Sequence, residues 1–594
     1  MEPPRRRPHV EPLPGEDVMA RTLGETRRSQ LVTTYGVGAV IAIEDESFMI
    51  SGLDHWDATD QDLWIHEPRL ERLRRVRHFV LPAASGDEKK DDIPVTRFPR
   101  WYSCPDCGEL DAHRYLAATP EKSECADCSA QLVPSRFVMV CEGGHIDDFP
   151  YKAWVHGRDG AREGTHRLKV KTLGMTASLR DIVINCSCGR SRSMEGAFRR
   201  NALKDVTWCS ANQPWLGRRD PDGCSRAPRV LQRGASNVWF SIVESAISIP
   251  PWSEEAFKAL NRYWEAVRHI PDEALPSVLT GMKLDEASGY TIDELVEAVR
   301  ERRAAEDPNT DLDADVIKDQ EYVALTRGKP QRSAKQDFVC VPAVSVTPAV
   351  ADVFQSVMVV KRLREVRVLS SFTRVREPEP ADLDERLSPL AREDLDWLPA
   401  IEVVGEGVFL ELSPERLAVW ESQKTVQDRA EVLRENARSR EQGKSSTLST
   451  RISARLLLTH TLAHLLINQW SLECGYPAAS LRERLYVNDE HAALLIYTAT
   501  SDSAGSLGGL ISQANPDRLE PSLRSALASA SWCSSDPLCI ESDPGGTDAL
   551  NWAACHCCAL LPETSCEEMN LLLDRAGVIG IPGRLNGLLQ DWMG

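Results

Sequence analysis

The chain has 594 residues, of which 42% are hydrophobic, and this composition excludes a disordered or a fibrous protein. Its length is enough for roughly two to four domains. The 89 Asp and Glu residues outnumber the 70 Lys and Arg residues, so the net charge is −19. That balance excludes a surface that is basic throughout, but it is compatible with a local basic surface that binds nucleic acid.

Nothing in the sequence predicts a membrane protein. The most apolar stretch, residues 456–467, is shorter than the roughly 18 residues that a membrane-spanning helix needs, and it contains two histidines. Three arginines near the N-terminus are followed by proline and acidic residues rather than by the apolar core of a signal peptide. We therefore expect a cytoplasmic protein, whose 17 cysteines serve as thiols and metal ligands rather than in disulfides.

Residues 1–100 predict an N-terminal α/β region that begins with a polar, proline-rich tail. The apolar stretch 37–43, which begins beside Gly36 and Gly38, predicts a strand. Residues 70–76 predict a short basic helix.

Residues 101–250 predict a zinc-ribbon-like, locally basic region with many turns. Two Cys-x-x-Cys pairs, 17 residues apart, give the clearest signal in the chain. Each such turn directs two sulfurs at one metal, and two turns complete the tetrahedral shell that zinc prefers. We expect a closed structural zinc site at Cys104, Cys107, Cys125 and Cys128.

A second quartet in this region has looser spacing. We expect a second zinc site at Cys186, Cys188, Cys209 and Cys224, beside which several glycines supply turns. Cys141 and His145, in the sequence Cys-Glu-Gly-Gly-His, are competing ligands for this metal or for another one. The alternative for that pair is a buried thiol and a histidine that is hydrogen-bonded to the backbone.

The same region carries an excess of positive charge. Residues 133–240 contain 18 Lys and Arg against 10 Asp and Glu, a net of +8, and subtracting +8 from −19 leaves −27 for the rest of the chain. A basic segment beside Trp208, Trp215 and Trp239 is a candidate contact for DNA, whose unpaired bases stack on aromatic rings. The alternatives are a solvated surface, tryptophans in the core, and arginines that hold an acidic partner. The candidate DNA-binding residues are Arg190, Arg192, Arg199, Arg200, Arg218, Arg219 and Arg233.

The next two regions differ in secondary structure. Residues 251–335 predict helices, including one that Thr291 and Glu294 begin as a capping box, and an acidic linker over 307–315. Residues 336–450 predict a β-rich segment followed by one long helix from Ser413 and Pro414 to Arg438.

Residues 451–594 predict a C-terminal domain with a third zinc site, at Cys533, Cys539, Cys555 and Cys558. Cys557 and Cys566 lie close by, so the choice of four ligands stays open. His460 and His464 lie one helical turn apart and have the spacing of a metal-binding pair, but their apolar surroundings favour buried, hydrogen-bonded histidines. A zinc peptidase would have Glu at position 461, where this chain has Thr.

Motifs for catalysis are missing from the sequence. A phosphate-binding loop at Gly443, Lys444 and Ser445 would need a glycine five residues before Gly443, and Arg438 stands there. Each of the three cysteine quartets supplies four thiolates and leaves no position for an activated water, so the expected zinc ions are structural.

Several strings of residues resemble a known family. These strings are Arg28–Gln30, Tyr35–Gly38, Cys141–Phe149, Arg233–Asn237, Leu363–Val366, Phe372–Arg374, His460–His464, Gly505–Leu510 and Cys533–Asn570. With them, the C-terminal domain is similar to the zinc-containing domain of MrfA-type DNA helicases, and the N-terminal strings narrow the resemblance to DrmB-type proteins of the DISARM anti-phage system. The resemblance covers most of the chain but little of residues 251–335.

The resemblance implies a partner and a role. DrmB-type proteins pair with DrmA, a helicase, and the complex engages DNA in phage restriction, so the motor would belong to another chain. We expect an α+β, multidomain protein with zinc modules of four cysteines each, a helical insertion and about three Zn2+ ions. Its expected function is that of a non-catalytic DNA-binding subunit beside a DrmA-like helicase, with single-stranded DNA as one candidate ligand. The alternatives are a nuclease with an unrecognised metal site and a scaffold that binds the helicase without DNA.

Overall fold

The computed structural model describes most of the chain between residues 22 and 593. The N-terminal arginines, the Gly443–Ser445 string and parts of the acidic linker and of Gly505–Leu510 lie outside the described residues. The gaps are residues 85–91, 121, 161–165, 175–177, 262, 289, 306–311, 332–335, 379–385, 442–447, 499–507 and 545–548.

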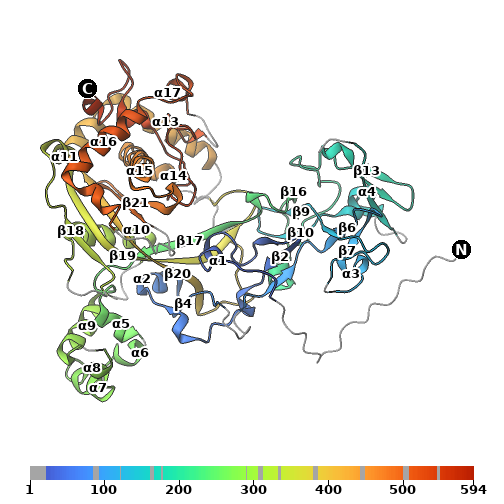
Figure 1. Ribbon diagram of the computed structural model, residues 1–594, viewed down its shortest axis with the longest axis horizontal. Coiled ribbons are helices and arrows are strands. Elements are labelled where there is room, and N and C mark those ends of the chain that lie inside the picture. The colour runs from blue at the N-terminus through green and yellow to red at the C-terminus, as the bar shows by residue number, and fades with distance from the viewer. Residues whose placement is uncertain are drawn as a thin grey trace.

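A large sheet, which contains two long strands, connects the N-terminal and the C-terminal parts of the molecule (Figure 1). Its five main strands lie in the order β17-β19-β20-β22-β21 and pair antiparallel, and the short strand β4 adds to β20 in parallel. Along the longest two, β19 and β20, buried and exposed residues alternate little, because both faces of these strands are covered. The strands are β3 Trp64–Ile65, β4 His78–Val80, β17 Phe240–Ile247, β18 Val339–Pro342, β19 Phe354–Thr373, β20 Trp397–Leu412, β21 Leu481–Val487 and β22 Ala492–Thr498.

Among the described residues, the N-terminal part contains four smaller sheets, one of which is the two-stranded hairpin β14–β15, and more than half of the cysteines. A six-stranded sheet has the order β13-β12-β11-β7-β6-β8, and two three-stranded sheets have the orders β10-β9-β16 and β1-β2-β5. The predicted strand at 37–43 is β1, and the predicted basic helix at 70–76 is α2 Pro68–Arg74. The other elements are α1 Gln30–Thr33, β1 Val40–Ile43, β2 Glu46–Ile50, β5 Val95–Arg97, β6 Trp101–Ser103, β7 Glu109–Ala112, α3 His113–Leu116, β8 Val133–Pro134, β9 Phe137–Val140, β10 Ile146–Asp148, α4 Tyr151–Gly160, β11 Leu168–Thr172, β12 Ile182–Cys186, β13 Ser191–Ser193, β14 Asn212–Gln213, β15 Arg218–Arg219 and β16 Arg229–Gln232.

The described residues between 255 and 327 are mostly helical, as expected. The first five helices bury their own apolar core and project from the rest of the molecule (Figure 1). The predicted capping box is present, since Thr291 Oγ1 accepts the Glu294 N–H and the Glu294 carboxylate accepts the Thr291 N–H. These helices are α5 Glu255–Asn261, α6 Trp264–Val267, α7 Leu275–Gly281, α8 Leu284–Ser288 and α9 Ile292–Ala305.

The sixth helix of this region, α10 Ala314–Arg327, packs on the central sheet instead. Its buried Glu321 accepts hydrogen bonds from the Ile247 N–H and from the guanidinium of Arg484. A buried carboxylate needs such partners, so this contact fixes the helix on the sheet.

The C-terminal part is built around the apolar helix α15 Ala454–Cys474, which lies between other helices and the sheet (Figure 1). Among the described residues, no helix is both long and apolar enough to span a membrane. The other helices of this part are α11 Pro348–Val353, α12 Pro414–Glu421, α13 Lys424–Glu441, α14 Leu448–Arg451, α16 Pro516–Ala530, α17 Leu538–Glu541 and α18 Arg575–Ile579.

The prediction of one long helix after Ser413 is wrong in one respect. Ser413 caps the helix as expected, since its Oγ accepts the Arg416 N–H, but the helix breaks between α12 and α13. The buried residues Leu417 and Trp420 are followed by Val426 and Ala430, and the interval of six between the two pairs does not fit one helix face. The break turns α13 so that its own apolar face is buried.

Arg374, immediately after β19, holds several distant segments together. Its guanidinium is fully buried and donates to the carbonyl oxygens of Gly38, Gly144 and Val238 at 2.7–2.9 Å. It lies over the Trp215 ring, 5.2 Å from the centroid. Burial lowers the pKa of Arg374 to about 9. The carbonyls therefore stabilise a cation that has no carboxylate within hydrogen-bonding distance among the described residues.

We predict that Arg374→Lys and Arg374→Ala destabilise the protein. A lysine cannot reach three carbonyls in different directions, and hydrogen bonds to a charged group contribute about 1.5–3 kcal/mol each. Both variants should unfold at clearly lower denaturant concentration than the wild type. Lys361→Ala, at an exposed position in β19, is the control and should change little. Equal stability of Arg374→Lys and the wild type would contradict the role given to this residue.

Candidate metal centres and the basic surface

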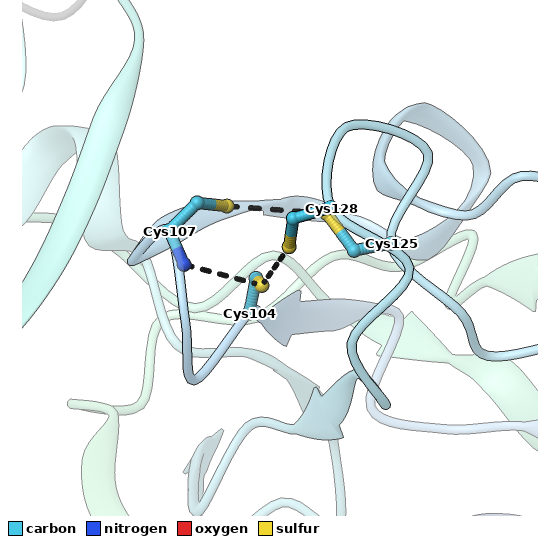
Figure 2. A group of neighbouring side chains, drawn as sticks. All are labelled: Cys104, Cys107, Cys125 and Cys128. Carbon is cyan, nitrogen blue, oxygen red and sulfur yellow. Dashed lines mark hydrogen bonds between the residues drawn. The ribbon is translucent and has the colours of Figure 1, made fainter.

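The first predicted quartet forms one cluster. Cys104 follows β6, Cys107 precedes β7, and Cys125 and Cys128 lie in a turn before β8. Figure 2 shows the four side chains pointing toward one another. The Sγ atoms of Cys104 and Cys128 are 3.3 Å apart, and those of Cys107 and Cys125 are 3.9 Å apart. Sulfurs about 2.3 Å from a tetrahedral zinc would be about 3.8 Å apart, so the cluster fits this ion.

Backbone turns orient these sulfurs. The Gly108 N–H donates to the Cys104 carbonyl, and the Ser129 N–H donates to the Cys125 carbonyl. Gly108 has a φ of +74° and Ser129 a φ of +61°, so both turns end in the left-handed region. Burial alone would raise the pKa of Cys104, but hydrogen bonds from the Cys107 backbone and from neighbouring thiols lower it to about 7. Burial raises the pKa of Cys107 in the same cluster to about 12, so Cys104 is the thiol that loses its proton more readily of the two.

The second predicted quartet is not one cluster, and the structure corrects this grouping. Cys209 and Cys224 lie with Cys141 and His145, and the four ligand atoms are within 4.8 Å of one another. Cys141 and His145 occupy the turn between β9 and β10, and the other two flank the hairpin β14–β15. The Cys141 Sγ is 3.8 Å from the Cys224 Sγ and 3.5 Å from the Cys209 Sγ.

A carboxylate orients the histidine of this cluster. The Nε2 of His145 lies 3.0 Å from Asp220 Oδ2, and its Nδ1 lies 3.5 Å from the Cys141 Sγ. When Nε2–H donates to Asp220, the lone pair of Nδ1 points at the cluster centre, and a carboxylate orients the histidine ligand of many zinc sites in the same way. Gly144, in the same turn, has a φ of +81°, and a Cβ there would lie 1.8 Å from Ser388 Oγ. The turn therefore requires glycine and is held against the segment that contains Ser388.

The other half of the predicted quartet belongs to a different cluster. Cys186, at the end of β12, and Cys188, in the following turn, lie with His156 and His166. The Nδ1 of His166 is 3.2 Å from the Cys186 Sγ, and the two imidazole rings are 4.2 Å apart. His156 lies in α4. Burial lowers the pKa of His156, and the ring nearby does so further, which favours the neutral form that binds metal.

The third predicted quartet is also one cluster. The Cys533 and Cys555 sulfurs are 3.4 Å apart, and Cys558 lies 3.8 Å from both Cys539 and Cys555. The fully buried Arg575 donates to Asp536, which is in the loop between the first two cysteines. Its guanidinium lies close to Cys539 and Cys558 and offsets part of the negative charge that four thiolates on zinc would carry.

His460 and His464 are buried and hydrogen-bonded, as expected, but they also belong to a fifth cluster. They lie with Glu483 in β21 and with Cys566, and all four side chains are buried. Cys557 belongs to none of the clusters found among the described residues. Sequence reasoning missed His156, His166 and Glu483 as candidate ligands. Cys186 and Cys188 have no further pair of cysteines close to them in the sequence. This incomplete ligand set was the signal that two more ligands must come from other elements.

The candidate DNA-binding arginines differ in exposure. Arg190, Arg192, Arg199, Arg200 and Arg219 are exposed, whereas Arg218 and Arg233 are half-buried. Arg218 donates to Gln213 and to the Arg392 carbonyl, and Arg192 lies 3.6 Å from the centre of the Trp154 ring. These contacts give Arg192 and Arg218 structural roles.

The three tryptophans near these arginines also differ. Trp215 is in the core, and Trp239 donates to the Val37 carbonyl. Trp208, in contrast, is 61% exposed.

The chain is similar to a known protein over most of its length and to two family models over parts of it. It is 30% identical over 553 residues to the DISARM protein DrmB of Bacillus paralicheniformis, an alignment that covers 90% of this chain and 96% of that protein. The model of the MrfA Zn-binding domain matches residues 462–559, and a domain of unknown function, DUF8724, matches residues 27–240. The zinc-binding match contains the complete cluster of Cys533, Cys539, Cys555 and Cys558.

We predict that Cys186 and Cys224 serve different metal ions. If each single serine variant loses one zinc ion, the double variant Cys186→Ser/Cys224→Ser should lose about two, because its substitutions fall in separate four-ligand clusters. Elemental analysis of the purified chains measures this difference. If the double variant lost no more zinc than either single variant, the two cysteines would share one site.

Proposed function

The chain belongs to the DrmB family of DISARM proteins, and on this premise we propose that it is a zinc-containing, non-catalytic subunit that binds DNA in anti-phage defence. In this proposal it acts beside a DrmA-like helicase, which supplies the motor. We propose the cytoplasm as its place of action, because clusters of free thiols persist in a reducing compartment.

The observation that carries DNA binding is a segment in which most side chains are exposed, residues 198–208. It contains the exposed residues Arg199, Arg200 and Lys204 and ends at Trp208, while Leu203 and Val206 anchor it in the core. The guanidinium of Arg158 lies 4.2 Å from the centre of the Trp208 ring. Cations for phosphates and an exposed aromatic side chain for bases are the two features that single-stranded DNA requires, and Trp208 is 61% exposed despite this contact.

The charge distribution supports the same surface. Residues 133–240 carry a net of +8, whereas subtracting +8 from −19 leaves −27 for the rest of the chain. Among the described residues, neither Arg199 nor Arg200 makes an ion pair, so both charges face solvent. An acidic protein with one basic surface would bind DNA in one orientation, because the rest of its surface repels phosphate.

The geometry of the clusters supports a non-catalytic subunit. Each of the clusters found among the described residues offers four protein ligands. Four ligands fill the tetrahedral shell of zinc and leave no position for the water that a metal nuclease activates. The clusters instead connect turns and strands that are distant in sequence, which is a structural role.

We predict that the double variant Arg199→Glu/Arg200→Glu binds DNA more weakly than the wild type. Each phosphate contact releases counterions from the DNA, and the variant loses such contacts. Its affinity should therefore fall at least about tenfold at moderate salt, and the dependence of affinity on salt should become shallower. Fluorescence anisotropy with labelled single- and double-stranded DNA, over a range of salt concentrations, measures both effects.

The matched control for this charge reversal is Lys283→Glu/Lys361→Glu, which makes the same change at two exposed lysines outside the basic segment. Its affinity should stay close to that of the wild type. Co-purification with the helicase partner should be measured on the same variants. If the charge-reversed variant kept its DNA affinity but no longer co-purified with the helicase, this surface would bind the helicase rather than DNA.

We predict that Trp208→Ala weakens binding to single-stranded DNA more than binding to double-stranded DNA. Stacking on one base contributes about 1–3 kcal/mol, and paired bases do not expose a face to the ring. Trp532→Ala is the control, since that side chain is 70% exposed and lies outside the segment. An equal loss on both forms of DNA would contradict stacking.

A further inference from the structure

We propose that His460, His464, Glu483 and Cys566 bind a fifth metal ion, of the zinc class, inside the C-terminal core. The first two residues lie one turn apart on α15, Glu483 lies in β21, and Cys566 lies in the segment that follows the Cys555–Cys558 turn. The site shares no residue with the cluster of four cysteines nearby in the sequence. This inference goes beyond the function proposed above and does not depend on it.

The four side chains converge in the core. The Nε2 of His460 lies 3.2 Å from the Cys566 Sγ and 3.1 Å from Glu483 Oε1. The Nε2 of His464 lies 3.4 Å from the same carboxylate oxygen. The four ligand atoms are all within 4.8 Å of one another, as ligands of one ion must be.

The hydrogen bonds around the cluster leave electron pairs facing its centre. His464 Nδ1 donates to the Ala559 carbonyl at 2.7 Å, so the neutral ring carries its lone pair on Nε2. That Nε2 has no hydrogen-bond partner among the described residues, and neither has Glu483 Oε2. A buried lone pair beside a buried carboxylate is repulsive unless a proton or a metal ion lies between them, and the test below separates these two cases.

The surrounding backbone prepares the other two ligands. Glu483 Oε1 accepts the Glu567 N–H at 3.1 Å, and the Cys566 Sγ accepts the Asn570 N–H at 3.1 Å. Both bonds stabilise the anionic forms that bind metal. Glu567 in turn accepts the Leu485 N–H, so the ligand segment is fixed along the free edge of β21.

The ligand set selects the ion. Two imidazoles, one carboxylate and one thiolate form a mixed nitrogen, oxygen and sulfur shell, which suits Zn2+ rather than Mg2+ or Ca2+. All four positions come from the protein, so the ion would be structural. It would tie the central helix of the C-terminal part to the edge strand of the sheet.

The test uses the full chain and the variants Glu483→Gln and Cys566→Ser. Glutamine keeps the carbonyl oxygen and can donate to His464 Nε2, so it suits a hydrogen-bonded cluster but is a poor metal ligand. If a metal is bound, both folded variants should contain about one zinc ion fewer than the wild type by elemental analysis. Cys557→Ser, at an exposed cysteine outside the clusters, should lose none.

A measurement on the wild type covers the case in which the variants do not fold. Anomalous diffraction at the zinc edge from crystals of the full chain should give a peak between His460 Nε2 and Glu483. Co2+ reconstitution adds a spectroscopic signature, since thiolate-to-cobalt absorption should decrease in Cys566→Ser. Unchanged zinc content in folded variants, or no peak at this position while the four-cysteine clusters show theirs, would overturn the proposal in favour of an ion pair between protonated His460 and Glu483.

Discussion

The hydrogen bonds of one buried guanidinium, that of Arg374, bring the N-terminal part of the molecule and the central sheet together. A cation of this size cannot be buried unless its N–H groups have partners. Its partners are carbonyls from the segment before β1, from the turn of the Cys141 cluster and from the residue before Trp239. Three segments that lie far apart in the sequence are therefore positioned by a single side chain at the end of β19.

The metal clusters solve a related problem on a local scale. The short strands and turns around the Cys104 cluster bury only a small apolar core of their own, which consists mainly of Tyr102, Leu116 and Leu132. Thiolate and imidazole ligands at the ends of these strands fix the turns where side-chain packing is insufficient. The Cys141 cluster also lies in the turn that Arg374 holds through Gly144, so metal binding and the buried cation restrain the same backbone.

The sequence predicted those features whose residues lie close together in the chain. Cys104, Cys107, Cys125 and Cys128 could be grouped because each pair forms one turn, and the capping box of Thr291 was visible for the same reason. Cys186 and Cys188 could not be given their partners, because His156 and His166 come from other elements and no spacing rule links them. Of the central sheet, the sequence predicted the β-rich segment within residues 336–450 but neither β21 nor β22, and the strand order could not be predicted because it depends on pairings between distant residues. The break between α12 and α13 was missed because it depends on which residues of each helix are buried against the rest of the fold.

The separate core of the helical insertion has a consequence for how the whole chain unfolds. Helices α5–α9 bury residues such as Phe257, Trp264 and Leu295 against one another, while α10 remains docked on the sheet through Glu321. The insertion can therefore melt without exposing the interior of the sheet. The chain is then not a single cooperative unit, and heating it should produce at least two transitions rather than one midpoint that describes all of its parts.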